Sequence, residues 1–561
     1  MHDMKMNRRG AMGLFGASSA VVLPGCTTAA TMGADYSGPV SFGHGVASGD
    51  PAADGAVIWT RISTGEGATG DIPVRWHVAA APGAQPTRSG TAMASAAADR
   101  TVKVEVTGLE PGRDYWYRFE GPDGSISPEG RFRTLPVGAV QNVVFAVASC
   151  QLYPGGYYNA YAHMARQERL DAVLMLGDYI YEYGEEGYGS DIGRRLGRLP
   201  DPPHETVTLA DYRRRHAQVK SDPDMQAAHA RAAFICVWDD HEVTNDGWIG
   251  GAENHQPATE GDWATRKATA MQAYFEWMPI RTPDPRRPAE AIFRSFEFGD
   301  LATLAMLETR LLARTEQLEF AGEVGDADAY AQFVSAIAQE DRELIGPQQR
   351  DWLQGVLSAS VNEGKPWQVI GNQVVMAQVS GPDLEGGMGP QPYAAFLAKL
   401  PSEWNGRVMA AQAGYRAGVP FNLDAWDGYP AARRRLYDTF RASGAKPIVL
   451  AGDSHAGWAN NLRDESGDLV ALEAGCTAVT SPSYGALLPG IGRYIEQANS
   501  EVAYCNQDRK GYTLLTLSPQ SARADFVTVS TVIDRQFEAD TDRSFVTAAG
   551  QAFGPWRTVG A

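Results

Sequence analysis

The sequence predicts an α/β protein with an N-terminal β-sandwich, followed by a larger domain of two sheets flanked by helices. Three observations support this fold class. Residues 40–136 alternate apolar and polar side chains between Gly, Pro and Asp turns, which is typical of antiparallel strands. From about residue 142, short apolar runs alternate with longer helical stretches, among them residues 209–234 and 263–277, and residues 381–389 are predicted to be a glycine-rich loop. Strand-like sequence returns after residue 453, which indicates a second sheet.

The first 26 residues have the pattern of an export signal. A pair of arginines precedes a short, weakly apolar stretch, residues 11–23, which is typical of a signal peptide of the twin-arginine route. The sequence Leu-Pro-Gly then leads to Cys26, where a bacterial lipoprotein would carry its lipid anchor. The alternative is a conventional signal cut a few residues later. We therefore expect a periplasmic, extracellular or cell-surface protein, with residues 27–39 as a linker.

Residues 40–136 are expected to form a structural β-sandwich. The turn 108–112, followed by alternating aromatic residues at Tyr115, Tyr117 and Phe119, resembles the turn and strand of a fibronectin type III domain. The usual role of that motif is packing, so we predict a scaffold rather than a site. Strands are predicted at residues 56–62, 73–79, 101–108, 114–120 and 130–135.

Composition excludes some classes of function. The 561 residues include 49 basic and 67 acidic side chains, and the formal net charge of −18 argues against stable binding to nucleic acid or anionic membranes. Five cysteines in a chain of this length do not form a disulfide framework. Cys236, Cys476 and Cys505 are predicted to be buried thiols, with a pairing among them left open.

Five apolar runs in the larger domain each end in residue types that bind metals. The runs are rich in Val, Ile and Leu, as strands buried on both faces are. Ligands bind beyond the carboxyl ends of such strands, so the residues that follow the runs would converge if the runs were neighbours in one sheet. Two carboxylates about 4 Å apart repel by roughly 4 kcal/mol at an effective dielectric of about 20, so such a cluster needs cations. The runs and the residues after them are 143–149 with Cys150, 172–177 with Asp178 and Tyr181, 234–238 with Asp239, Asp240 and His241, 367–371 with Asn372 and Gln373, and 447–452 with Asp453 and His455.

The first candidate residues follow the runs that end before positions 150 and 178. Asp178 and Tyr181 offer a carboxylate and a phenolate, which suit a trivalent ion such as Fe(III); the alternative is a turn aspartate with a packing tyrosine. Cys150 is a thiolate ligand or an inert buried thiol.

The other candidates follow the later runs. Adjacent acids at Asp239 and Asp240 are costly after an apolar strand unless a cation is present. Asn372 and Gln373 are amide groups that could bind a metal or hold a water, and Arg310 is a candidate contact for an anion or a structural arginine.

Seven segments together resemble the alkaline phosphatase D family, in the right order and over nearly everything from residue 40 to the end. Each motif is weak alone, but the combination is specific. The segments are 42–51, 148–151, 176–184, 237–242, 371–373, 451–455 and 508–512.

This resemblance implies a fibronectin-like domain on a calcineurin-like metallophosphoesterase core at residues 140–561, with an iron site and nearby calcium. It implies that Fe(3+) is held by Cys150, Asp178, Tyr181 and His455, with Asp178 bridging, and that Asp240 and Asp453 face Ca(2+). Asp239 adds charge where the wider phosphoesterase pattern has Gly-Asn-His-Glu, which fits a large cation that prefers oxygen.

We therefore expect an exported enzyme that hydrolyses phosphate monoesters, diesters or both through a metal-bound hydroxide. His241 is the predicted catalytic acid, and Asn372, Gln373 and Arg310 are predicted to contact the substrate. One alternative is a phosphodiesterase with phospholipase D-like activity on phospholipid or nucleic-acid diesters. The other is a non-catalytic lipoprotein that binds phosphate or calcium.

Overall fold

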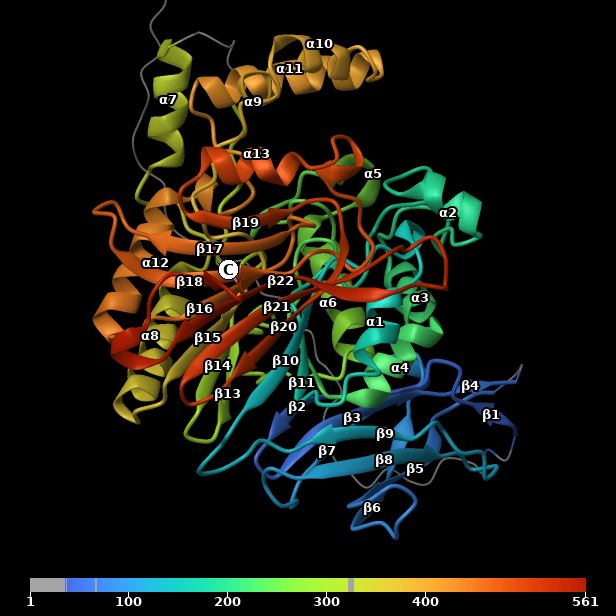
Figure 1. Ribbon diagram of the computed structural model, residues 1–561. Coiled ribbons are helices and arrows are strands. Elements are labelled where there is room, and N and C mark those ends of the chain that lie inside the picture. Colours follow the sequence, from blue (N-terminus) through green and yellow to red (C-terminus); the bar gives the residue numbers. More distant parts are fainter. Residues whose placement is uncertain (1–35, 37, 66–67, 321–326, 561) are drawn as a thin grey trace, which may run out of the picture. The chain divides into compact units, whose positions relative to one another are not determined.

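Two large sheets and two small ones carry the strands of the protein (Figure 1). The computed structural model describes residues 36, 38–65, 68–320 and 327–560, all within the compact unit Gly33–Ala561. The predicted export signal 1–26 and Cys26 lie outside the described residues, as does most of the predicted linker 27–39.

The first large sheet has ten strands and contains three of the five apolar runs. Its parallel centre is β10 (Val143–Ala148), β11 (Ala172–Met175) and β12 (Phe234–Cys236), with Leu174 opposite both Val147 and Ile235. The antiparallel strands beyond β10 are β20 (Lys510–Leu517), β21 (Ser521–Val529), β22 (Ala539–Ala548) and β23 (Arg557–Thr558). Beyond β12 lie β2 (Val46–Ala52), β3 (Gly55–Arg61) and β7 (Thr101–Val106).

The second large sheet has seven strands and contains the other two runs. Its order is β13 (Arg294–Phe298), β14 (Ala302–Met306), β15 (Trp367–Gly371), β16 (Ile448–Ala451), β18 (Leu469–Gly475), β17 (Gly457–Arg463) and β19 (Val502–Asn506). Four strands of this sheet are parallel to one another: β14, β15, β16 and β18.

The five runs are therefore divided between two sheets and are not all neighbours in one. The two sheets pack against each other, because Phe145 of β10 and Phe298 of β13 meet edge to face at 4.9 Å and share one core with Leu304 and Val369. An apolar run shows that both faces of a strand are buried, but it does not show which strand lies beside it. The carboxyl ends still meet, since residues that follow β10 and β11 of one sheet and β16 of the other place ligand atoms within 4.8 Å of one another.

The N-terminal segment contributes to three sheets. Strands β6 (Arg88–Ala94), β5 (Ile72–Ala79), β8 (Asp114–Glu120) and β9 (Gly130–Arg133) form a four-stranded sheet, while β1 (Val40–Ser41) pairs with β4 (Ser63–Thr64). Strands β2, β3 and β7 join the ten-stranded sheet through β12, where Phe234 is opposite Gly49. A Cβ at Gly49 would lie 2.1 Å from the Pro279 carbonyl oxygen, so this junction requires glycine.

Helices cover the sheets, and Figure 1 shows α8 and α12 beside the seven-stranded sheet. The predicted helix 209–234 is two helices, because Pro223 begins α4 and the Asp222 carboxylate caps it. The predicted glycine-rich loop 381–389 contains α9. None of the described helices has the length and hydropathy of a membrane span.

The α-helices are α1 (Asn159–Met164), α2 (Ser190–Leu196), α3 (Leu209–Lys220), α4 (Pro223–Arg231), α5 (Pro257–Glu260), α6 (Trp263–Trp277), α7 (Ala327–Ile337), α8 (Gly346–Asn362), α9 (Leu384–Met388), α10 (Pro390–Leu397), α11 (Ser402–Arg416), α12 (Pro430–Ser443) and α13 (Ile491–Ala498). The 3₁₀ turns are η1 (Ala96–Ala98), η2 (Tyr153–Gly155), η3 (Trp426–Gly428), η4 (Tyr484–Ala486) and η5 (Gly550–Ala552).

Candidate metal centre and active site

Four of the predicted metal ligands have left-handed backbones directly after their strands. The φ angles are 59° at Cys150, 56° at Asp178, 58° at Asp453 and 57° at His455. Such a conformation costs a non-glycine residue about 1–2 kcal/mol, and it is found mainly where function requires it. The strained turns redirect these side chains from the strand ends into one volume.

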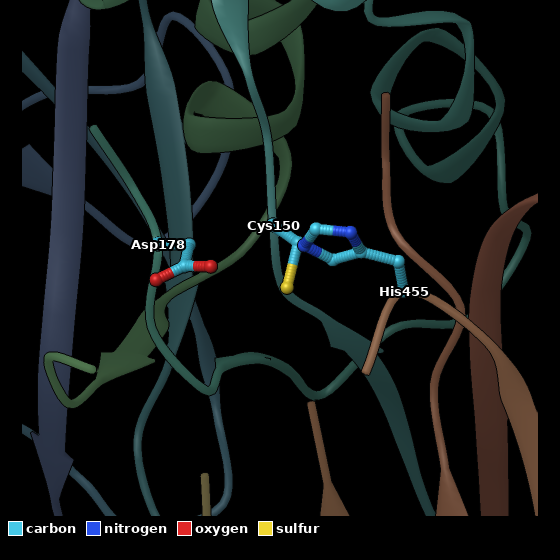
Figure 2. Close-up of side chains that lie close together, drawn as sticks. All are labelled: Cys150, Asp178 and His455. Carbon is cyan, nitrogen blue, oxygen red and sulfur yellow. The ribbon is translucent and has the colours of Figure 1, made fainter. Parts of the chain in front are cut away.

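The first group of candidate ligands comes from both large sheets. Cys150 follows β10, Asp178 follows β11 and His455 follows β16, and one ligand atom from each lies within 4.8 Å of the others (Figure 2). The Tyr181 hydroxyl donates to Asp178 Oδ2 at 2.9 Å and lies 3.4 Å from His455 Nε2. The four residues predicted to hold iron are thus neighbours in space.

Two further groups overlap the first. Asp178, Asp240 and His241 form one, and Asp239, Asp240 and Asp453 form the other, each with ligand atoms within 4.8 Å. Asp178 belongs to the first two groups and Asp240 to the last two. The three groups therefore form one continuous row of candidate metal ligands that come from both sheets.

The described residues leave several of these carboxylate oxygens without a hydrogen-bond partner. The buried, unpartnered atoms are Asp178 Oδ1, Asp239 Oδ2 and Asp240 Oδ1. Burial raises the pKa of Asp178 well above its usual value, and burial with the charge of Asp424 does the same for Asp453. Burial and the charge of Lys510 lower the pKa of His455 to about 3, so its imidazole is neutral, as a metal ligand must be.

The chemistry of the donors fits cations of two kinds. Sulfur, imidazole nitrogen, phenol and carboxylate together suit a transition metal, whereas the group of three carboxylates suits calcium. Burial and the neighbouring Asp178 charge raise the pKa of the Cys150 thiol well above its usual value, and only a bound cation would reverse this. The unpartnered oxygens and the donor types thus fit the expected ions.

Arg310 lies at the centre of the acidic groups rather than at an open surface. Its side chain is fully buried; it donates to Asp239, to Asp424 at 2.7 Å and to Asp453 at 3.2 Å, and it lies 3.7 Å from Asp240. Burial opposes its charge, yet these carboxylates raise the pKa of Arg310 well above its usual value. The guanidinium neutralises part of the cluster, so its donors are occupied within the protein.

Asn372 and Gln373 are fully buried, and their amides are also occupied within the protein. Asn372 donates to the Val374 carbonyl and accepts from the indole of Trp426 at 3.0 Å. Gln373 donates to the Leu307 carbonyl at 2.9 Å and accepts from Thr309 at 2.6 Å. The structure thus assigns both amides hydrogen bonds that shape the strand end, and neither belongs to the three groups of candidate ligands.

Two residues that shape the site were not among the predicted site residues. Glu242 accepts the backbone N–H groups of Asp178, Tyr179 and Asp239, at 3.1, 2.6 and 2.8 Å, and so links the turns after β11 and β12. Asp424 lies in a loop far along the chain and pairs with Arg310. Only the position of Glu242 directly after the acidic motif could have pointed to it.

Two family models match this chain. The model described as PhoD-like phosphatase matches residues 145–526, and the PhoD-like phosphatase N-terminal domain matches residues 26–136. With the two-sheet fold and the acidic strand ends, these matches identify a phosphoric ester hydrolase.

A curated relative and a solved structure are each similar to this protein over most of its length. Alkaline phosphatase D of Bacillus subtilis (strain 168) is 35% identical over 519 residues, which cover 90% of this chain and 80% of that protein. A solved structure titled "Structure of PhoD" matches with a TM-score of 0.75 at 33% identity, over 93% of this chain and 92% of that one. The chain belongs to the PhoD-like phosphatase family. The resemblance and the α/β class inferred from sequence are both confirmed.

Proposed function

We propose that this phosphoesterase depends on iron and calcium bound at the ends of the parallel strands. Cys150, Asp178, Tyr181 and His455 would hold Fe(3+), as the mixed donor set of the first group supports. Asp178, Asp239, Asp240 and Asp453 would supply carboxylate oxygens to Ca(2+). The observation that carries this proposal is the set of three overlapping ligand groups, in which Asp178 Oδ1, Asp239 Oδ2 and Asp240 Oδ1 are buried without a hydrogen-bond partner among the described residues.

Bound cations would make water more acidic and neutralise the negative charge of the phosphoryl oxygens. The chain's own residues supply the remaining functions. His241 is only 8% exposed, and Asp178 and Asp240 lie beside it. Burial opposes protonation of His241, but the charges of Asp240, Glu182 and Asp178 raise its pKa well above the usual value. We assign His241 the transfer of a proton to the leaving oxygen of the ester.

The proposed substrates are phosphate monoesters and diesters. Two exposed tyrosines flank the ligand groups: Tyr188, 36% exposed, stacks on His455 at 6.2 Å, and Tyr484 is 52% exposed. The carbonyl of Pro482, two residues before Tyr484, lies 2.6 Å from His455 Nδ1 and accepts from the Tyr188 hydroxyl at 2.7 Å. These rings offer surface to the organic part of an ester, so diesters with larger groups belong in the same proposal.

Export and a lipid anchor are part of this proposal as well. They rest on the arginine pair and on Cys26, both in the segment 1–26. An exported phosphoesterase would release phosphate from esters outside the cytoplasm. Cell fractionation and mass analysis of the mature N-terminus test both points: a cytoplasmic protein that retains residues 1–26 would contradict them.

Metal analysis tests the cofactor assignment most directly. The purified protein is expected to contain iron and calcium and to absorb visible light through a tyrosinate–Fe(III) bond. Activity should be assayed on a mono-aryl and a bis-aryl phosphate. Colourless protein that contains zinc would overturn the iron assignment, and full activity after complete metal removal would overturn metal dependence.

A further inference from the structure

Glu182 lies beside the proposed acid and belongs to none of the groups of candidate ligands. Its side chain is fully buried, and its Oε2 lies 2.7 Å from Nδ1 of His241. The other oxygen, Oε1, accepts from Asn245 N at 2.9 Å, Asn254 Nδ2 at 3.0 Å and Thr244 Oγ1 at 3.1 Å. Three donors therefore anchor one oxygen and leave the other for the imidazole.

The residues on either side of Glu182 hold the same imidazole ring. The ring of Tyr181 lies 4.2 Å from that of His241, at an interplanar angle of 33°, and the ring of Tyr183 lies 5.4 Å away. Three consecutive residues thus contact His241 through two aromatic rings and one carboxylate. Since Nδ1 is used by Glu182, Nε2 is the nitrogen that can face the reacting groups.

We propose that Glu182 is a positioning residue for catalysis: it fixes the orientation of the His241 ring so that Nε2 delivers its proton to the leaving oxygen. This inference rests on the proposed acid role of His241. A carboxylate partner accepts the Nδ1 proton, which defines the tautomer and holds the ring plane against rotation. In this proposal Glu182 acts only through the imidazole, since it belongs to none of the candidate ligand groups.

Glu182→Gln is a sharp perturbation because the amide keeps the shape but cannot satisfy both ends. If its oxygen faces His241, its NH₂ group faces three donors, from Thr244, Asn245 and Asn254. If its NH₂ group faces His241, Nδ1 must become an acceptor and the imidazole loses the protonated form that an acid needs. Either orientation disturbs the ring that Glu182 holds.

The readout is the dependence of the rate on the leaving group. An ester of an acidic alcohol such as p-nitrophenol needs little protonation, whereas an alkyl ester needs much, so loss of an acid affects the alkyl ester more. General acids contribute roughly 10²–10⁴-fold to rates. We expect Glu182→Gln to lower kcat about 100-fold for an alkyl phosphate and less than about tenfold for p-nitrophenyl phosphate. KM and bound metal should change little, which a collapsed site would not allow.

Three reference variants make the result specific. His241→Ala should show the same leaving-group pattern, and adding Glu182→Gln to it should cause no further loss, because Glu182 acts through the imidazole. Glu473→Gln is the matched control: Glu473 is also fully buried and accepts from Met376 N, Ala377 N and Asn460 Nδ2. That control should lower stability without any leaving-group dependence. Glu182→Asp keeps the charge and serves if the amide variant does not fold; it should give the same pattern with a smaller loss.

Each outcome decides between the two proposals. If His241→Ala shows leaving-group dependence while Glu182→Gln and Glu182→Asp lose activity equally on all esters, the positioning role is wrong and the acid role stands. If His241→Ala lowers all rates equally, the acid role fails and the positioning role fails with it. Additive losses in the double variant, or leaving-group dependence in Glu473→Gln, would also overturn the inference.

Discussion

Replacing Arg310 with methionine should make the stability of this protein depend strongly on calcium. Arg310 is fully buried, and four carboxylates lie within 4.0 Å of its guanidinium. Oxygens of Asp239, Asp240 and Asp453 lie within 4.8 Å of one another, and two unit charges at that distance repel by about 3.5 kcal/mol at an effective dielectric of about 20. Without the guanidinium, only protonation or a bound cation can offset this repulsion.

The expected size follows from measurements on broken buried ion pairs, which cost about 3–5 kcal/mol. A chain of 561 residues has an unfolding entropy of about 1.2 kcal/mol/K, at about 2.1 cal/mol/K per residue. Arg310→Met should therefore lower the melting temperature by about 3–4 °C in the presence of a chelator. Saturating calcium should restore most of this difference, because the ion supplies the positive charge that the variant lacks.

The assay is thermal unfolding with chelator and with excess calcium, for the wild type, the variant and a control. Arg286→Met is the control, since that side chain is 87% exposed and its pair with Asp284 contributes little. The reasoning is refuted if Arg310→Met melts like the wild type in chelator, or if calcium raises both melting temperatures equally.

Three further predictions concern metal content, colour and pH. Asp178→Asn should lose iron and calcium together and lower kcat more than about 10³-fold, because this carboxylate belongs to two ligand groups; metal analysis showing full occupancy would contradict this. Tyr181→Phe should lose the visible absorption band, while Tyr183→Phe should keep it; a band that survives in the first variant excludes Tyr181 as an iron ligand. Lys220 is fully buried, its Nζ donates to Tyr179 Oη at 2.9 Å, and burial lowers its pKa to about 7. The unfolded chain binds a proton here that the folded chain releases, so Lys220 should contribute a rise in stability of about 1.4 kcal/mol per pH unit between pH 7 and 10. Lys220→Met should reduce the slope by that amount, and an unchanged slope would contradict the assignment.

The short apolar strands and the residues after them were visible in the sequence because burial on both faces leaves an uninterrupted apolar run. The strand ends at Cys150, Asp178, Asp239 and Asp453 follow from that pattern alone, and β15 has the predicted bounds Trp367–Gly371. The helix Trp263–Trp277 was also predicted with its observed bounds. Local periodicity and composition are enough for such elements, since they depend on which faces are buried.

The partners of those strands could not be predicted in this way. The apolar runs did not show which strands pair, whereas the structure divides the runs between two sheets, and N-terminal strands β2, β3 and β7 extend the first of them. Pairing depends on contacts between residues far apart in the chain, and Gly49 permits the junction at β12 only because Pro279 and Phe234 lie against it. No local pattern contains that information.

By itself, the sequence determined the class of the protein, the buried strands and the acidic, thiol and imidazole groups at their ends, because motif order and side-chain chemistry are local properties. Only the tertiary structure decided that Arg310 neutralises the carboxylates and that Glu182 contacts His241. It also showed that the side-chain amides of Asn372 and Gln373 form hydrogen bonds within the protein. Charge neutralisation and hydrogen-bond satisfaction depend on which groups meet in space. These properties appear only once the two sheets are packed together.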